Sequence, residues 1–135
     1  MAQVKNNSTP VNQDAKPYGQ ELILDFEDVD MSRFDPKFIE SFCRTVVKSI
    51  NMEAGPFHLW GNPSDENGPA DPKCDGMSCV LFLEHSSMTC HFLDRLNKVF
   101  VNIFSCDDFD SFAAIQLCEK KLGGKIISHR VVTRL

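Results

Sequence analysis

The chain has 135 residues, a mass of 15.2 kDa and a formal net charge of −5, and 42% of its residues are hydrophobic. This length suffices for one domain with a single core, and the acidic balance argues against a general nucleic-acid binder. No stretch is apolar over the roughly 18–20 residues that a membrane span needs, and the polar N-terminus lacks the apolar segment of a signal peptide, so we expect a cytoplasmic protein that does not enter membranes.

The ordered domain is predicted to begin after a polar tail. Residues 1–18 are rich in Asn, Gln and Lys and are expected to be disordered, which leaves residues 19–135 as the domain. A strand is predicted from residue 19 because Leu22, Leu24 and Phe26 alternate with polar or mixed positions.

An amphipathic helix is predicted next. Asp35 is a favourable N-cap, and Pro36 fits the first helical position. The apolar stripe of this helix has the 3.6-residue period of a surface helix and consists of Phe38, Ile39, Phe42, Val46 and Val47.

The remainder of the chain reads mainly as strands. A Gly-, Pro- and Asp-rich loop is predicted over residues 61–76, and a second helix over 107–124 carries a stripe of Phe109, Phe112, Ala113 and Leu117. Gly123 is its predicted stop. Strands are expected at residues 55–60, 77–84, 87–92, 98–105 and 125–134. The order β-α-β-β-β-β-α-β favours an α+β two-layer sandwich, an antiparallel sheet with helices packed on one face.

Six cysteines raise the question of disulfides or a metal site. They are Cys43, Cys74, Cys79, Cys90, Cys106 and Cys118. No C-x-x-C pair is present, so we expect reduced thiols, most of them small buried apolar residues, and no zinc or other metal site.

One short stretch carries most of the chemistry. Residues 83–92 read LEHSSMTCHF, with an acid, two histidines, two serines, a threonine and a cysteine in ten positions. Ser78, Ser86, His91 and Cys106 could form a site if the neighbouring strands align. Composition and periodicity do not show that they meet, and a polar strand of a structural domain explains the same residue types.

The spacing of these residues resembles that of S-adenosylmethionine decarboxylases of the short prokaryotic and viral type. The family's G-x-S strand corresponds to Gly76 and Ser78, its self-cleaving serine to Ser86, and the end of its H-x-[ST]-x-H run to Thr89 and His91. Phe104-Ser105-Cys106 matches its strand end, and residues 57–60 (FHLW) match its F-H-x-aromatic strand.

The resemblance implies a protein that makes its own pyruvoyl cofactor. Ser86 would attack the carbonyl of His85, and cleavage between residues 85 and 86 would leave the pyruvoyl group on residue 86. Ser78 and His91 would serve this processing, with His91 as proton acceptor. The pyruvoyl carbonyl would then bind the substrate amino group as a Schiff base, and Cys106 would act as the general acid after loss of CO2.

The family also implies the substrate and the assembly. The expected substrate is S-adenosylmethionine, whose decarboxylated product serves polyamine (spermidine) synthesis. Trp60, Phe57 and Asp94 are the predicted substrate-binding residues, with Trp60 either a stacking surface or a core or interface aromatic. The family's short members are at least dimers, so a homo-oligomer is expected. The sequence does not reveal its size or whether putrescine activates it.

Three positions depart from the family pattern and motivate alternatives. His85 stands where the family has a glutamate, Ser87 replaces a histidine, and Arg95 replaces an acid that helps to hold the substrate ribose. Arg95 favours an alternative substrate, an amino acid such as ornithine or arginine. His85 and Ser87 favour a third possibility, an uncleaved pseudoenzyme that acts as a binding or regulatory subunit.

Overall fold

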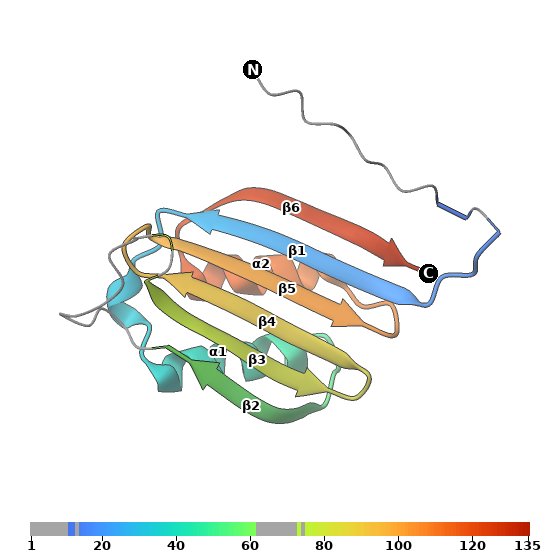
Figure 1. Ribbon diagram of the computed structural model, residues 1–135, viewed down its shortest axis with the longest axis horizontal. Helices are drawn as coiled ribbons and strands as arrows, with labels where there is room; N and C mark the ends of the chain where they lie inside the picture. Colours follow the sequence, from blue (N-terminus) through green and yellow to red (C-terminus); the bar gives the residue numbers. More distant parts are fainter. Residues whose placement is uncertain (1–10, 13, 62–72, 74) are drawn as a thin grey trace, which may run out of the picture.

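The computed structural model describes residues 11–12, 14–61, 73 and 75–135, and these form one sheet covered by two helices (Figure 1). The strands are β1 (Gly19–Glu27), β2 (Ala54–Trp60), β3 (Gly76–Leu83), β4 (Ser86–Leu93), β5 (Lys98–Ser105) and β6 (Lys125–Arg134). The helices are α1 (Pro36–Ser49) and α2 (Ser111–Leu122), with a short 3₁₀ turn at Met31–Arg33. No helix in this described part is long and apolar enough to cross a membrane.

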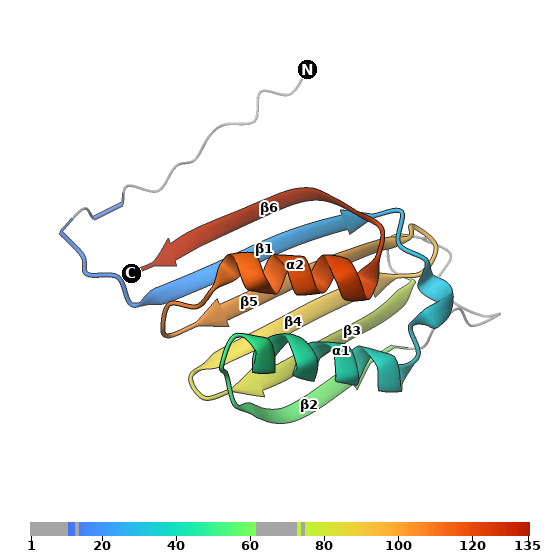
Figure 2. The same ribbon diagram turned by 180° about the vertical axis from the view of Figure 1, so that it is seen from behind.

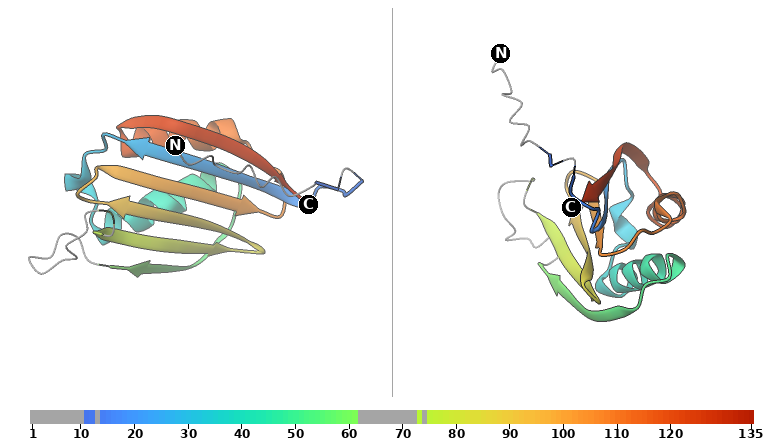
Figure 3. Two further views of the ribbon diagram at one scale, coloured as in Figure 1. Left: turned by 45° about the horizontal axis from the view of Figure 1, so that its top comes forward. Right: turned by 90° about the vertical axis from the view of Figure 1, so that its right-hand side faces the viewer.

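The sheet has six antiparallel strands in the order β2-β3-β4-β5-β1-β6. Both helices lie on one face of it (Figure 2), and the end-on view in Figure 3 shows the two layers. The predicted α+β two-layer sandwich is therefore confirmed, and β6 lies at one edge of the sheet. The tail prediction for residues 1–18 and the loop prediction for 61–76 fall largely outside the described residues.

The core lies between the helices and the inner face of the sheet. Asp35 caps α1 as predicted, because its carboxylate accepts the N–H of Phe38 at 2.8 Å. Four of the five residues predicted for the α1 stripe are buried, and Phe38 packs partly buried against the core. Each fully buried aliphatic or aromatic side chain stabilises the fold by about 1.5–3 kcal/mol.

The predicted stripe of α2 is correct in part, because Phe109 and Leu117 pack partly buried against the core, but the fully buried face of the helix lies elsewhere. Phe112 is 66% exposed, and the buried residues of this helix are Ala114, Cys118 and Leu122. Asp110 is the N-cap, so the helix starts four residues later than predicted. The small side chains of Ala114 and Cys118 let α2 pack closely, whereas the prediction gave most weight to the large aromatic residues.

Candidate active site

The sequence-predicted cleavage position lies in the two-residue turn between β3 and β4. Leu83 pairs with Ser86, which leaves Glu84 and His85 as the turn. His85 has a φ of 53°, in the left-handed region that costs a non-glycine residue energy. The peptide bond proposed to break therefore follows a strained residue, a feature that clusters at functional sites.

Ser86 and Cys106 meet across neighbouring strand ends. The backbone N–H of Cys106 donates to Ser86 Oγ at 3.0 Å. Cys106 follows β5 directly, and β5 is the neighbour of β4 in the sheet. The preceding residue, Ser105, is 3% exposed and accepts the N–H of Asp107 on its Oγ at 3.1 Å. That buried hydroxyl holds the loop that carries Cys106, a positioning role for Ser105 that was not predicted from the sequence, although Ser105 belongs to the matched Phe104-Ser105-Cys106 stretch.

These residues line a cavity of about 750 Å³ at one end of the sheet, the right-hand end in Figure 1. The C-terminal end of α1, the β3–β4 turn and the β5–α2 loop enclose it. No Lys or Arg is among the described residues that line it, whereas five carboxylates do. These five carboxylates belong to Glu53, Glu84, Asp107, Asp108 and Asp110. The cavity therefore suits a cationic ligand.

Ser78 and His91 form a second pair on the other face of the sheet. Ser78 Oγ lies 2.7 Å from His91 Nδ1, and the two residues are directly opposite in the β3–β4 register. Trp60 pairs with Ser78 from β2 and is 85% exposed. Together they line a hollow of about 520 Å³ on the sheet face that carries no helix. This exposure excludes the core interpretation of Trp60 within one chain.

The two pairs do not meet within one chain. His91 lies five residues beyond Ser86 along β4, about 16 Å away at roughly 3.3 Å per residue. Ser86 shares the alternation of the buried Met88 and Cys90, so it lies on the helix-covered face, whereas His91 lies on the open face.

The other two predicted binding residues, Phe57 and Asp94, do not line the cavity at Ser86. Phe57 pairs with the buried Leu81 and packs against the core, on the opposite face from Trp60. Asp94 follows β4 at its far end, about 26 Å from Ser86 at roughly 3.3 Å per residue. At that same end, the guanidinium of Arg95 contacts the buried carboxylate of Asp75 at 3.0 Å.

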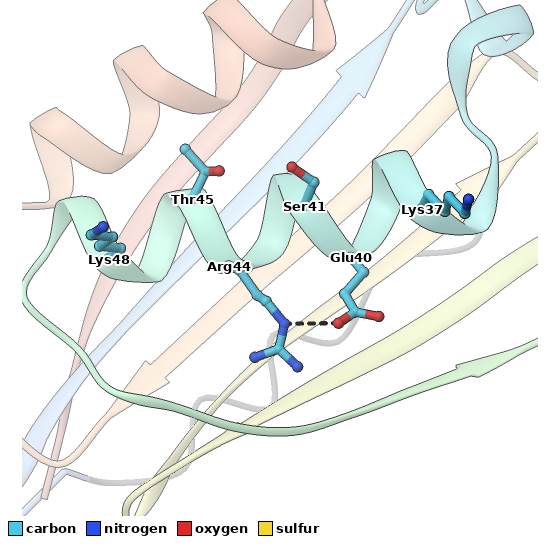
Figure 4. Close-up of a pocket in the computed structure, with 6 residues that line it drawn as sticks. All are labelled: Lys37, Glu40, Ser41, Arg44, Thr45 and Lys48. Carbon is cyan, nitrogen blue, oxygen red and sulfur yellow. Dashed lines mark hydrogen bonds and ion pairs between the residues drawn. The ribbon is translucent and has the colours of Figure 1, made fainter.

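A further hollow, of about 450 Å³, lies on the outer surface of α1 and carries no comparable chemistry (Figure 4). Glu40 and Arg44 are joined there as an ion pair at 2.8 Å. The hydroxyls of Ser41 and Thr45 point away from this pair, so the helix presents no nucleophile with a base beside it.

The family model described as S-adenosylmethionine decarboxylase matches residues 20–135. The chain belongs to this family. Its fold is similar to that in the crystal structure of the adenosylmethionine decarboxylase from Aquifex aeolicus VF5, with a TM-score of 0.70 and 21% sequence identity over 89% of this chain and 92% of that one. No curated protein sequence matches the chain. Family and fold together indicate decarboxylase (carboxy-lyase) chemistry on a small-molecule substrate.

Proposed function

We propose that the chain cleaves itself between His85 and Ser86 and then decarboxylates S-adenosylmethionine to supply polyamine synthesis in the cytoplasm. One observation carries the proposal: Ser86 Oγ accepts a hydrogen bond from the Cys106 backbone in the lining of an acidic cavity, directly after a residue with left-handed φ. Nucleophile, strained peptide and candidate acid thus lie together at the position that the family pattern predicts.

Cleavage would begin with attack of Ser86 Oγ on the His85 carbonyl. The peptide bond becomes an ester, and the Ser86 nitrogen is released as an amine. Removal of the Ser86 α-proton then expels the His85 carboxylate, and water replaces the nitrogen, which leaves as ammonia. Residue 86 ends as a pyruvoyl group, which serves as the electron sink for CO2 loss when a substrate is bound. The new C-terminus at His85 and the new N-terminal group at residue 86 would both lie in the lining of the acidic cavity.

The strain at His85 provides a test of the first step. The left-handed conformation costs a non-glycine residue about 1–2 kcal/mol, and glycine adopts it freely. We therefore expect His85→Gly to slow self-cleavage about 5-fold, measured as the fraction of intact chain against time. Asn97→Gly is the matched control because Asn97 has a φ of 52° in the distant β4–β5 turn. A His85→Gly chain that cleaves at the original rate would show that the strain has no role.

Cys106 is the proposed general acid of the decarboxylation. Its contact with Ser86 is made by the backbone N–H and not by the thiol, so a side-chain substitution preserves that contact. We expect Cys106→Ala to keep self-cleavage but to lower CO2 release by about 10²–10⁴-fold, the usual size of general acid–base catalysis. Cleavage is read from intact mass and turnover from released CO2. Undiminished turnover would refute the role of the thiol.

The separation of the two pairs supports a homodimer. Ser78 and His91 are proposed to serve processing, yet they lie about 16 Å along β4 from Ser86 at roughly 3.3 Å per residue and on the opposite face. In a two-fold dimer that brings the open face of each chain against the Ser86 end of its partner's sheet, the Ser78–His91 pair of one chain would complete the site at Ser86 of the other. Trp60 and Asp94 would then act on the partner's substrate, and two equivalent sites would form.

The carboxylates of the cavity support a substrate with positive charge near the reacting carbon. S-adenosylmethionine has both a sulfonium and an ammonium group. An amino acid such as ornithine or arginine is the second candidate, favoured by Arg95, which occupies the position of the family's ribose-binding acid and is paired with Asp75. The third candidate, an uncleaved regulatory subunit, rests on His85 and Ser87.

The deciding experiment has two steps. The purified protein should give two chains by intact mass, with the C-terminal one starting at a pyruvoyl group on residue 86. CO2 release from carboxyl-labelled S-adenosylmethionine should then exceed release from ornithine and arginine. A single full-length chain after long incubation would leave only the regulatory candidate, and preferential release from an amino acid would select the second one. Putrescine added to the same assay tests activation.

A further inference from the structure

Three cysteines that lie far apart in the sequence form a cluster in the core. Cys43 comes from α1, Cys79 from β3 and Cys90 from β4. The Sγ of Cys43 lies 3.8 Å from that of Cys79 and 3.9 Å from that of Cys90, and all three sulfurs lie within 4.8 Å of one another. The three residues are 0–5% exposed. We call these three residues the thiol cluster.

The fold determines the geometry of the cluster. Cys79 and Cys90 are directly opposite in the β3–β4 register, and both point to the helix-covered face. Cys43 lies between the buried Phe42 and Val46 in the sequence of α1, and its thiol contacts those of Cys79 and Cys90 from the helix layer. All three side chains start from regular secondary structure, so little ordering is needed to bring the sulfurs together, and such rigid supports favour precise ligand sites.

The triangle of sulfurs has the size of a metal site. An ion equidistant from three sulfurs with these separations lies about 2.2–2.5 Å from each, against about 2.3 Å for a zinc–thiolate bond. The sulfurs are already in van der Waals contact, so an ion could enter with shifts of a few tenths of an ångström.

The chemistry of the cluster selects the kind of ion. Among the described residues, no fourth His, Cys, Asp or Glu joins the three thiols. Structural zinc is almost always four-coordinate, whereas soft thiolate ligands also suit Cu(I). The cluster is buried in the hydrophobic core, which disfavours water as a fourth ligand. We propose that the thiol cluster is a three-sulfur site for a soft monovalent ion, Cu(I), with each metal–thiolate bond replacing an S–H bond and no change in the oxidation state of any sulfur.

Cys118 is a fourth buried thiol, which lies on α2 and does not belong to the cluster. The expectation from sequence spacing, that the chain has no metal site, considered only cysteines close together along the chain.

The test is a competition titration of the reduced full-length protein without oxygen. Cu(I) is supplied as its complex with bathocuproine disulfonate, and withdrawal of the ion is read from the loss of the chelator's absorption. The original chain should withdraw one ion at high affinity. Cys43→Ala and Cys90→Ala should each weaken this binding at least about 10-fold, whereas Cys118→Ala should bind like the original. The uncleavable Ser86→Ala chain should also bind normally, which separates this proposal from the self-cleavage proposal.

A second measurement covers the case in which a cluster variant folds poorly. Cu(I) should raise the Tm of the original chain and of Cys118→Ala, and should leave that of Cys43→Ala unchanged. Failure of the original chain to withdraw Cu(I), or equal withdrawal by Cys43→Ala, would overturn the proposal. A tetrahedral Co(II) spectrum that the cluster variants lack would replace it with a four-coordinate site of the zinc type.

Discussion

Replacing Ser86 with alanine is expected to leave the chain in one piece and to abolish decarboxylation. The Oγ that attacks the His85 carbonyl is absent in Ser86→Ala, and without cleavage no pyruvoyl group is available to serve as electron sink. Intact mass should show the uncut chain after long incubation, and CO2 release should fall to background. Because Ser86 lies at a half-buried strand end, its loss is expected to leave the fold unchanged.

Ser87→Ala is the matched control for this prediction. Ser87 is the adjacent serine on the same strand, is also half-buried, and pairs with Phe104 of β5. Alternation along β4 directs its side chain to the open face, away from Cys106. Ser87→Ala should therefore still cleave. A Ser86→Ala chain that cleaves, or a Ser87→Ala chain that alone fails to do so, would move the reaction to Ser87 and contradict the assignment.

Two inactive variants are expected to restore cleavage when mixed. If the Ser78–His91 pair of one chain serves Ser86 of its partner, a mixed dimer of Ser86→Ala and His91→Ala has one complete site. In that site the His91→Ala chain supplies Ser86, and the Ser86→Ala chain supplies His91. With random pairing, about half of the His91→Ala chains should then be cut. Each variant alone should stay uncut, and mass spectrometry distinguishes the two chains in the mixture.

The control for complementation is a mixture of Ser78→Ala with His91→Ala. These residues belong to the same hydrogen-bonded pair, so no arrangement of the two variants contains an intact one. This mixture should stay uncut. Cleavage by His91→Ala alone would show that His91 has no essential part in processing. Absence of cleavage in the first mixture, with subunit exchange verified, would contradict the shared site.

The elements of the fold were predictable from local patterns. Period-2 alternation located β1, and Asp35 with Pro36 located the start of α1, because these signals depend on neighbours along the chain. The buried face of α2 was not predictable in the same way. Its sequence is only weakly amphipathic, and close packing of Ala114 and Cys118 outweighed the burial of Phe112.

The candidate site, too, was predictable from the sequence in part only. By itself the sequence determined which residue types stand at which spacing, from Ser78 to Cys106, and this was enough to predict the family that residues 20–135 match. Only the tertiary structure decided which of these residues meet. Strand alternation and register separate Ser86 and Cys106 from Ser78 and His91, on opposite faces of one sheet.

For the cysteines, the sequence predicted the state of each thiol but not which thiols lie together. Spacing along the chain indicated buried, reduced thiols, and Cys43, Cys79, Cys90 and Cys118 are indeed free and buried, whereas Cys74 lies outside the described residues. That three of them meet in one cluster required the register of β3 on β4 and the rotation of α1 about its axis. The chemistry of each residue could be predicted from its type and spacing. Which residues meet was decided by the tertiary structure, because register and helix rotation are set by packing over the whole core.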